Sequence, residues 1–250
     1  MQRSFAAVFA VLALFLMYRA AAVAGPPYET DDPEPTAYRD YEIYLFTEAR
    51  IEPRSEDAVP LALEVNYGLF PNVQFSVSFG SAYAQNAGSG HIGWGDEEIA
   101  LKYRFLRETR TRPQLAFYPS FTLATGAQRF DLGPGHGTLL LPLWTQKSSG
   151  KWTVFGGGGL LLDSAVPHGH TWIEGVAVTR DVSEKTNVGV EVFHSGSVAD
   201  VPAYTDLGVG LIHDLGALHG VLFSAAVNVA GVRSYHAYAA YEWRLGPTRR

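Results

Sequence analysis

Several acidic and basic residues of this chain stand where they could do chemistry together. Two carboxylates can act as general acid and general base, and glutamates suited to this recur at seven positions. Because lysine and arginine residues are interspersed among them, we favour a network of ion pairs over catalysis. The candidate polar set is Glu42, Glu48, Glu64, Asn66, Glu98, Lys102, Arg104, Glu174, Arg180, Glu191, Asp206, Glu242 and Arg244.

Histidines offer two other kinds of chemistry. His194 and Ser195 could form a hydrolase pair, but a base and its nucleophile must hydrogen-bond to each other. Adjacent residues of a strand point to opposite faces, which separates these two side chains. His168 and His170 could ligate a metal, although a zinc site needs three or four converging ligands. We therefore predict no enzyme activity, no catalytic residue, and no metal or cofactor site.

Two further motifs have simple structural interpretations. The run Gly156–Gly159 resembles a phosphate-binding loop, but no Lys-Ser or Lys-Thr pair follows it. In a strand such glycines mark a sharp bend or a close approach of the backbone. The acidic group from Thr30 to Glu34 could bind calcium. Its prolines oppose regular structure, so we expect residues 25–40 to form a periplasmic segment rich in proline and acids, with folding back into the lumen as the alternative.

These side chains can meet only if the chain folds into elements that bring them together, and the pattern indicates strands. From Val73 to Gly80, large apolar residues occupy the odd positions and small or polar residues the even ones. Successive side chains of a strand point to opposite faces, so this segment has one apolar and one polar face. The same alternation recurs in twelve segments between residues 41 and 245.

The connections between these segments alternate in length. One set is longer and rich in Gly, Ser, Asn and Pro, whereas the other set runs from three to six residues. Long loops at one end, tight turns at the other and an even strand number are typical of outer-membrane barrels. The longer gaps are 51–60, 84–93, 125–137, 163–170, 195–203 and 230–233, and the shorter ones are 70–72, 107–112, 148–150, 181–186 and 215–218.

We therefore predict an all-β fold, a transmembrane antiparallel up-and-down β-barrel of about 12 strands. The barrel should span residues 41–245, with a tail at 246–250 and the short turns on the periplasmic side. A periplasmic lipocalin-like barrel or a sandwich would also alternate. Aromatics near the strand ends of the apolar face favour the membrane barrel, with interface girdles at Tyr67, Tyr103, Trp152, Tyr235 and Trp243. The polar faces, with the candidate set above, would line the lumen.

Composition and the first residues narrow the class of protein. The chain has 250 residues, no cysteine, 47% hydrophobic residues and a mean hydropathy near zero. Residues 1–24 have a basic start, a short apolar stretch and a small-residue exit, which is the pattern of a cleaved Sec-type secretory signal. A retained membrane anchor is the alternative. Without these residues, 17 basic and 25 acidic side chains remain, so we expect no nucleic-acid partner.

Several stretches resemble a known bacterial family. They are the mature start Gly25–Pro35, Glu64–Gly68, Gly95–Phe105, Leu141–Lys147 and Glu191–His194. They are similar to outer-membrane transporters named after the meta-pathway of phenol degradation. The resemblance covers nearly all of the mature chain, and it implies a β-barrel with a transport role. Such barrels usually end on an aromatic residue, whereas here five residues follow Leu245.

Three functions follow from these observations as hypotheses. The first is a porin-like channel or transporter that passes a small molecule through a narrow polar lumen. The second is a closed structural or surface-binding barrel that uses its long outer loops. The third is a lipid-modifying hydrolase. In each case we expect the outer membrane of a Gram-negative bacterium, with outer-membrane lipids and the barrel-assembly machinery as partners and a small-molecule solute for the channel.

Overall fold

The computed structural model describes residues 27–53, 55–86, 89–164, 170–197 and 202–249. The signal segment 1–24 and His168 lie outside these residues. Two short 3₁₀ helices, Gln128–Phe130 (η1) and Pro247–Arg249 (η2), accompany the strands. The strands are Tyr41–Ile51 (β1), Ser55–Phe70 (β2), Val73–Asn86 (β3), Ser89–Trp94 (β4), Glu97–Leu106 (β5), Gln114–Phe117 (β6), Ser120–Leu123 (β7), Thr138–Ser149 (β8), Trp152–Asp163 (β9), His170–Asp181 (β10), Thr186–Ser195 (β11), Tyr204–Asp214 (β12), His219–Ala230 (β13) and Tyr235–Leu245 (β14).

In two places, a pair of successive strands forms the two halves of a single barrel strand. β3 pairs with β5 from Val73 to Ser78 and with β4 from Ser81 onward, so β4 and β5 follow each other along one neighbour. β6 and β7 both pair with β5 and with β8, and Pro119 separates them. Because proline has no N–H to donate, it interrupts the ladder there. The barrel therefore has the twelve strands that the alternation predicts.

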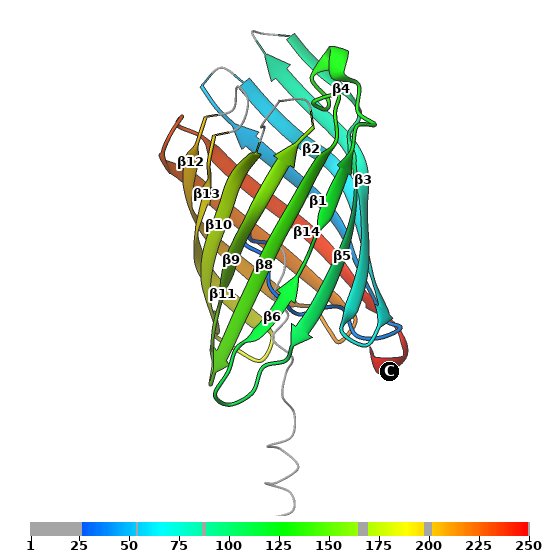
Figure 1. Cartoon of the computed structure of the whole chain (residues 1–250), viewed down its shortest axis with the longest axis vertical. Coiled ribbons are helices and arrows are strands. Elements are labelled where there is room, and N and C mark those ends of the chain that lie inside the picture. The colour runs from blue at the N-terminus through cyan, green and yellow to red at the C-terminus, as the bar shows by residue number, and fades with distance from the viewer. Residues whose placement is uncertain (1–26, 54, 87–88, 165–169, 198–201, 250) are drawn as a thin grey trace, which may run out of the picture.

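The sheet closes on itself. Every sequential pair is antiparallel, and β14 pairs with β1 over eleven residues, from Tyr41 opposite Leu245 to Ile51 opposite Tyr235. Figure 1 shows the strands as one tilted wall that surrounds the dark-blue N-terminal segment. Because the sheet closes, the barrel wall has no free edge strand; of the described strands only β4, at the long-loop end, pairs on one side alone, with β3. Among the described residues, no helix is long and apolar enough to cross a membrane.

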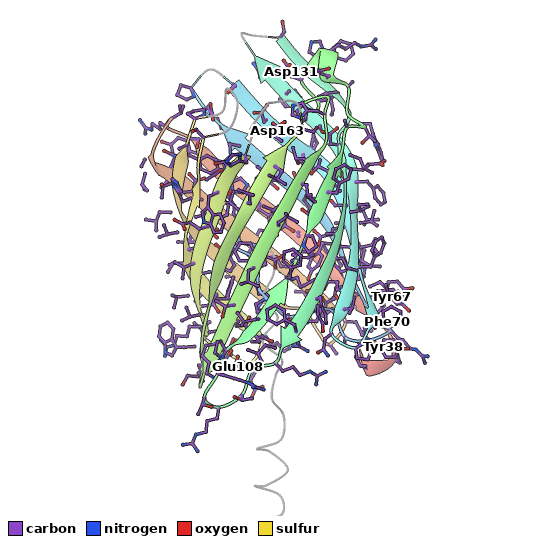
Figure 2. The ribbon with its side chains drawn as sticks, viewed as in Figure 1. Tyr38, Tyr67, Phe70, Glu108, Asp131 and Asp163 are labelled. Carbon is purple, nitrogen blue, oxygen red and sulfur yellow. The ribbon has the colours of Figure 1, made fainter. Side chains whose placement is uncertain are left out.

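The two ends of the barrel differ. Tyr67, Phe70 and Tyr38 lie at the end that carries the short turns, and Asp131 and Asp163 lie at the other, long-loop end (Figure 2). Two of the predicted long loops are largely strand instead, since β2 begins at Ser55 and β3 runs to Asn86 before β4 starts at Ser89. Backbone pairing between neighbouring strands needs no apolar face, so hairpins extend beyond the alternating part of the sequence.

The N-terminal segment corrects our expectation. We expected residues 25–40 to lie in the periplasm, whereas the stretch from Tyr28 to Thr36 packs against and bonds the inner wall of the barrel. Thr30, Asp32 and Asp40 are fully buried, and Tyr28 packs edge-on against Phe155. The segment contains no strand, in keeping with its prolines, and it forms only one isolated bridge to the sheet. We call residues 27–40 the plug.

A contact at the closing seam joins the two ends of the barrel chain. Asp40 precedes β1, and its carboxylate accepts hydrogen bonds from the backbone N–H and the hydroxyl of Thr248, beyond β14. Between these residues Gly246 has φ +138° and lies against Asp40, so a side chain at position 246 would collide with it. The tail after Leu245 therefore packs against the start of β1.

This contact gives a testable prediction. Asp40→Ala removes the charged acceptor of both hydrogen bonds from Thr248. Hydrogen bonds to charged groups contribute more than neutral ones, so we expect the free energy of unfolding to fall by about 2 kcal/mol. Asp40→Asn keeps an acceptor oxygen and should lose less. Urea unfolding in lipid vesicles, followed by the heat-modifiable shift on gels, measures both. An Asp40→Ala barrel as stable as the parent would show that the tail contributes nothing to closure.

Candidate functional site in the barrel lumen

The lumen is lined by the polar face of the strands. On β1, Glu42, Glu48 and Arg50 share the inner face with the buried ring of Tyr44. Farther around the wall, past β14 and β13, Asp206 is buried on β12 and Glu191 on β11. Of the thirteen predicted lumen residues, eleven point inward: Glu42, Glu48, Glu64, Asn66, Glu98, Lys102, Arg104, Glu191, Asp206, Glu242 and Arg244.

Two predicted lumen residues point outward instead. On β10 the buried positions are Thr171, Ile173, Ala177 and Thr179, which puts the even-numbered side chains on the outer surface. Glu174 there accepts a hydrogen bond from the indole of Trp172, and Arg180 lies over the ring of Trp152. Our interpretation of β10 was one residue out of phase, because Trp172 and Val176 share the outer face with these two charged residues.

The plug rests on one arc of the wall at glycine positions. A Cβ atom added at Gly189 would meet the Tyr28 hydroxyl at 2.4 Å, and one at Gly210 would meet the Tyr28 ring at 2.6 Å. A Cβ atom at Gly175 would meet the Thr30 hydroxyl at 2.1 Å. These three glycines lie on the inner face of β10, β11 and β12, so their missing side chains make the space that Tyr28 and Thr30 fill.

Polar contacts hold the plug in place. The carboxylate of Glu191 accepts hydrogen bonds from the backbone N–H groups of Glu29 and Thr30, at 3.2 and 3.0 Å. Farther along, the plug crosses to the β3 and β5 wall, where Asp31 pairs with Lys102 at 3.0 Å and Glu34 pairs with Arg104. The N–H of Thr36 donates to the Gln74 amide oxygen at 2.8 Å.

Glu29 stands at the centre of a charged cluster. Arg50 bridges it to Asp206, with Nη–O distances of 3.3 Å to Glu29 and 2.9 Å to Asp206. The ring of His236 lies 3.6 Å from Glu29 and 3.0 Å from Glu48. Tyr204 donates a hydrogen bond to Glu29 and places its ring under the Arg50 guanidinium. The cluster joins the plug to β1, β12 and β14.

Burial changes the proton affinity of two plug carboxyls. It raises the pKa of Glu29 to about 7, against the opposing charges of Arg50 and His236. It raises the pKa of Asp32 to about 8, although Lys102 lowers it and the N–H of Glu34 donates to one of its oxygens. Both shifts arise because the plug leaves water for the barrel interior, where the charged form is disfavoured.

A separate ion network lies near the short-turn end. The Arg244 guanidinium bonds both oxygens of Glu242, and its Nη2 also bonds Asp214 at 2.6 Å. The Tyr44 hydroxyl donates to Glu242 at 3.3 Å. These residues fill this part of the lumen with paired charges. The free-energy cost of burying the charges is small only because each charge has a partner.

An internal cavity remains between the plug and the arc formed by β14, β1, β2, β3 and β5. It consists of two adjoining parts of about 180 and 380 Å³ that share Tyr28, Glu29, Glu64, Ser78 and Glu98 as lining residues. The larger part reaches Asp96, whose carboxylate accepts a hydrogen bond at 2.6 Å from the N–H of Gly126 in the loop that follows β7. The lining of both parts is rich in carboxylates.

The other sequence candidates take the following places. His194 and Ser195 point to opposite faces, and the His194 ring bonds Thr205 rather than Ser195. Among the described residues no group of three or more His, Asp or Glu side chains could hold a metal ion. The glycines of β9 are confirmed as sites of close approach: a Cβ at Gly157 would meet the Leu143 carbonyl oxygen at 2.0 Å and the Trp144 ring at 3.0 Å.

The interface aromatics lie on the outer surface. Trp152, Tyr103 and Tyr235 are about half exposed. Tyr67 stacks on Tyr41, and Trp243 packs edge-on against Tyr241. Sequence reasoning missed the functional part of the plug, above all Tyr28, Glu29 and their partner Arg50. A usable signal was present, because Gly189 and Gly210 stand at inward positions where a strand would otherwise carry a side chain.

Comparison with solved structures supports the same architecture. An outer-membrane channel from Pseudomonas putida F1 is similar, with a TM-score of 0.68 and 13% identity, over 86% of this chain and 98% of that one. The translocator domain of the autotransporter NalP from Neisseria meningitidis has a TM-score of 0.57 and 10% identity, over 82% and 88%. The NanC porin has a TM-score of 0.55 and 6% identity, over 81% and 100%. The fold is thus that of outer-membrane β-barrels.

Sequence comparison adds nothing further. No protein-family model matches the chain, and no curated protein sequence matches it significantly. Identities of 6 to 13% to the three structures show the fold alone. What the barrel does must therefore be argued from its own lumen.

The glycine wall gives a prediction for the plug. In Gly210→Ala the three atoms nearest the new methyl group all belong to Tyr28, so overpacking should loosen the plug and leave the wall intact. We expect cleavage after Glu29 by a glutamate-specific protease to become about tenfold faster. Gly216→Ala is the matched control, because nothing lies within 4 Å of a Cβ at that position. Equal cleavage rates in the two variants would contradict the packing of Tyr28.

The raised carboxyl pKa values give a second prediction. The docked plug holds protons on Glu29 and Asp32 that a solvated plug releases near pH 4, so docking is fully favoured below that pH. Its stability should then fall as the pH rises through about 7 to 8. Accessibility of the plug to a protease of broad specificity, which does not need Glu29 for cleavage, should increase at most about tenfold per pH unit for each proton. In the variant Glu29→Gln with Asp32→Asn the dependence should flatten, and an unchanged profile would refute the assignment.

Proposed function

We propose that this chain is an outer-membrane channel for a small molecule, with a lumen that the plug narrows. The observation that carries the proposal is the plug itself, a segment without regular structure that is held inside a closed barrel by side-chain contacts. Such contacts can be broken without unpairing any strand of the wall. The fold shared with an outer-membrane channel and a porin is consistent with passage of a solute.

The proposal includes the setting of the barrel. We propose that residues 1–24 are a Sec-type signal and that the barrel-assembly machinery inserts the chain into the outer membrane of a Gram-negative bacterium. The outer apolar surface, with Val190, Val209 and Phe223 about half exposed, would face lipid. The five girdle aromatics would lie at the two interfaces. Membership in the family named after the meta-pathway of phenol degradation belongs to this proposal too.

A closed structural barrel is the second candidate, and the filled lumen favours it. Tyr44 is buried, and Phe46 stacks on Tyr238 at 5.6 Å between ring centres. With the paired charges of Glu242 and Arg244, these rings occupy much of the interior. The two candidates differ in one respect: a channel must conduct when the plug is free to move, and a structural barrel must not.

A reversible lock on the plug tests the channel. The natural chain has no cysteine, and a Cβ at Gly175 would lie 3.1 Å from the Thr30 Cβ. In the variant Thr30→Cys with Gly175→Cys, a small shift of the plug brings the Cβ–Cβ distance to the roughly 3.8 Å that a disulfide requires. In planar bilayers the oxidised protein should conduct at least about tenfold less than the reduced protein. If the disulfide favours the docked plug over the displaced plug by about 1.4 kcal/mol, that ratio already follows.

The two single-cysteine variants serve as controls, and their conductance should not respond to reductant. If the reduced double variant and the parent never conduct, the structural barrel is favoured. If oxidised and reduced protein conduct equally, solute passes without displacement of the plug, and the gating part of the proposal fails.

A further inference from the structure

The internal cavity has an uncompensated negative character. Glu64 and Glu98 line both of its parts, and their hydrogen-bond partners are neutral: Asn66 donates to Glu64 at 2.8 Å and Ser120 donates to Glu98 at 3.2 Å. Neither forms an ion pair among the described residues. Lys102 forms its ion pair with Asp31 instead. Charged carboxylates in a confined interior are costly without a cation, so this lining favours a positively charged occupant.

Aromatic rings face the same space. Phe46 and Tyr238 stack on each other at one side of the larger part, and Tyr118 lines the smaller part. Tyr28 of the plug lines both. The faces of such rings attract cations, and their apolar bodies pack against hydrocarbon or aromatic groups. Carboxylates interleaved with rings therefore suit an organic cation better than a bare metal ion.

Polar atoms with no partner line the cavity as well. In the described part of the chain, the hydroxyls of Tyr28 and Tyr238 and one carboxylate oxygen of Asp96 are buried without a hydrogen bond. All three residues line the larger part of the cavity, and Tyr28 is only 9% exposed. Buried polar atoms are normally satisfied. An ammonium group has donors for the Asp96 oxygen and for the Tyr238 hydroxyl oxygen. The Tyr28 hydroxyl is turned toward the wall at Gly189, so Tyr28 offers the cavity its ring.

We propose that this cavity is a binding site for small organic cations, namely a protonated amine that carries an aromatic or other apolar group. The ammonium would lie among Glu64, Glu98 and Asp96, and the apolar group would pack on Phe46, Tyr238 and Tyr28. The volume of about 380 Å³ in the larger part is that of a small-molecule pocket. If the site selects which solutes pass through the barrel, that role rests on the proposed channel. Binding of the amine does not depend on the channel.

Three probes of similar size test the proposal: 2-phenylethylamine, 2-phenylethanol and phenylacetate. Calorimetric titration of the folded, detergent-solubilised barrel should show binding of the amine at least about tenfold tighter than the alcohol, with no binding of phenylacetate. In the variant Glu64→Gln with Glu98→Gln the affinity for the amine should fall at least about tenfold, a loss of about 1.4 kcal/mol. The affinity for the alcohol should stay within about twofold. Glu174→Gln, which changes an outward-facing carboxylate, is the matched control and should bind as the parent does.

Equal affinity for the amine and the alcohol, or an unchanged affinity of the double variant, would overturn the proposal. Heat-modifiable migration of each variant confirms that the barrel is folded before titration. Conductance of the lipid-reconstituted barrel, measured separately, distinguishes the two proposals. Amine binding without conductance would refute the channel and support the binding site. Conductance without amine binding would support the channel and refute the binding site.

Discussion

Closure of the sheet is the constraint on which the rest of the structure depends. Backbone groups in a membrane have no water to bond, so the first and last strands must pair along their whole length. Here Tyr41 through Ile51 pair with β14, and Asp40 accepts a hydrogen bond from Thr248 in the tail that follows β14. Once the wall is closed, each strand has one face toward the lumen and one away from it, and every other feature follows from that division.

The enclosed space brings a difficulty that the plug resolves in part. Inward positions carry many more carboxylates than cations, and buried charges need partners. Backbone N–H groups of Glu29 and Thr30 serve Glu191, and Arg50 serves both Glu29 and Asp206. Yet the plug also brings Asp31, Asp32 and Glu34 into the lumen, where Lys102 and Arg104 bond two of them. Glu64 and Glu98, beside the cavity, therefore remain without an ion pair in the described part of the chain.

The shape of the plug site is decided by the absence of side chains. Gly175, Gly189 and Gly210 leave a hollow on one arc of the wall, and Tyr28 and Thr30 fill it. The arc formed by β14, β1 and β2 carries full-sized residues such as Phe46, Glu64 and Tyr238, which line the cavity. The plug thus crosses the lumen instead of lying along its axis, and it is anchored to strands far apart in the sequence.

The sequence by itself determined the wall. Strict alternation in segments such as Val73–Gly80 encodes two faces, and the period of two assigns most charged residues to the lumen; it failed only on β10, where Glu174 and Arg180 share the face of Trp172. Tertiary structure alone decided the interior. Residues 27–40 have no periodicity, so no local pattern could place them. Their position depends on long-range contacts such as Thr30 with Glu191, 161 residues apart, which exist only after the barrel has closed.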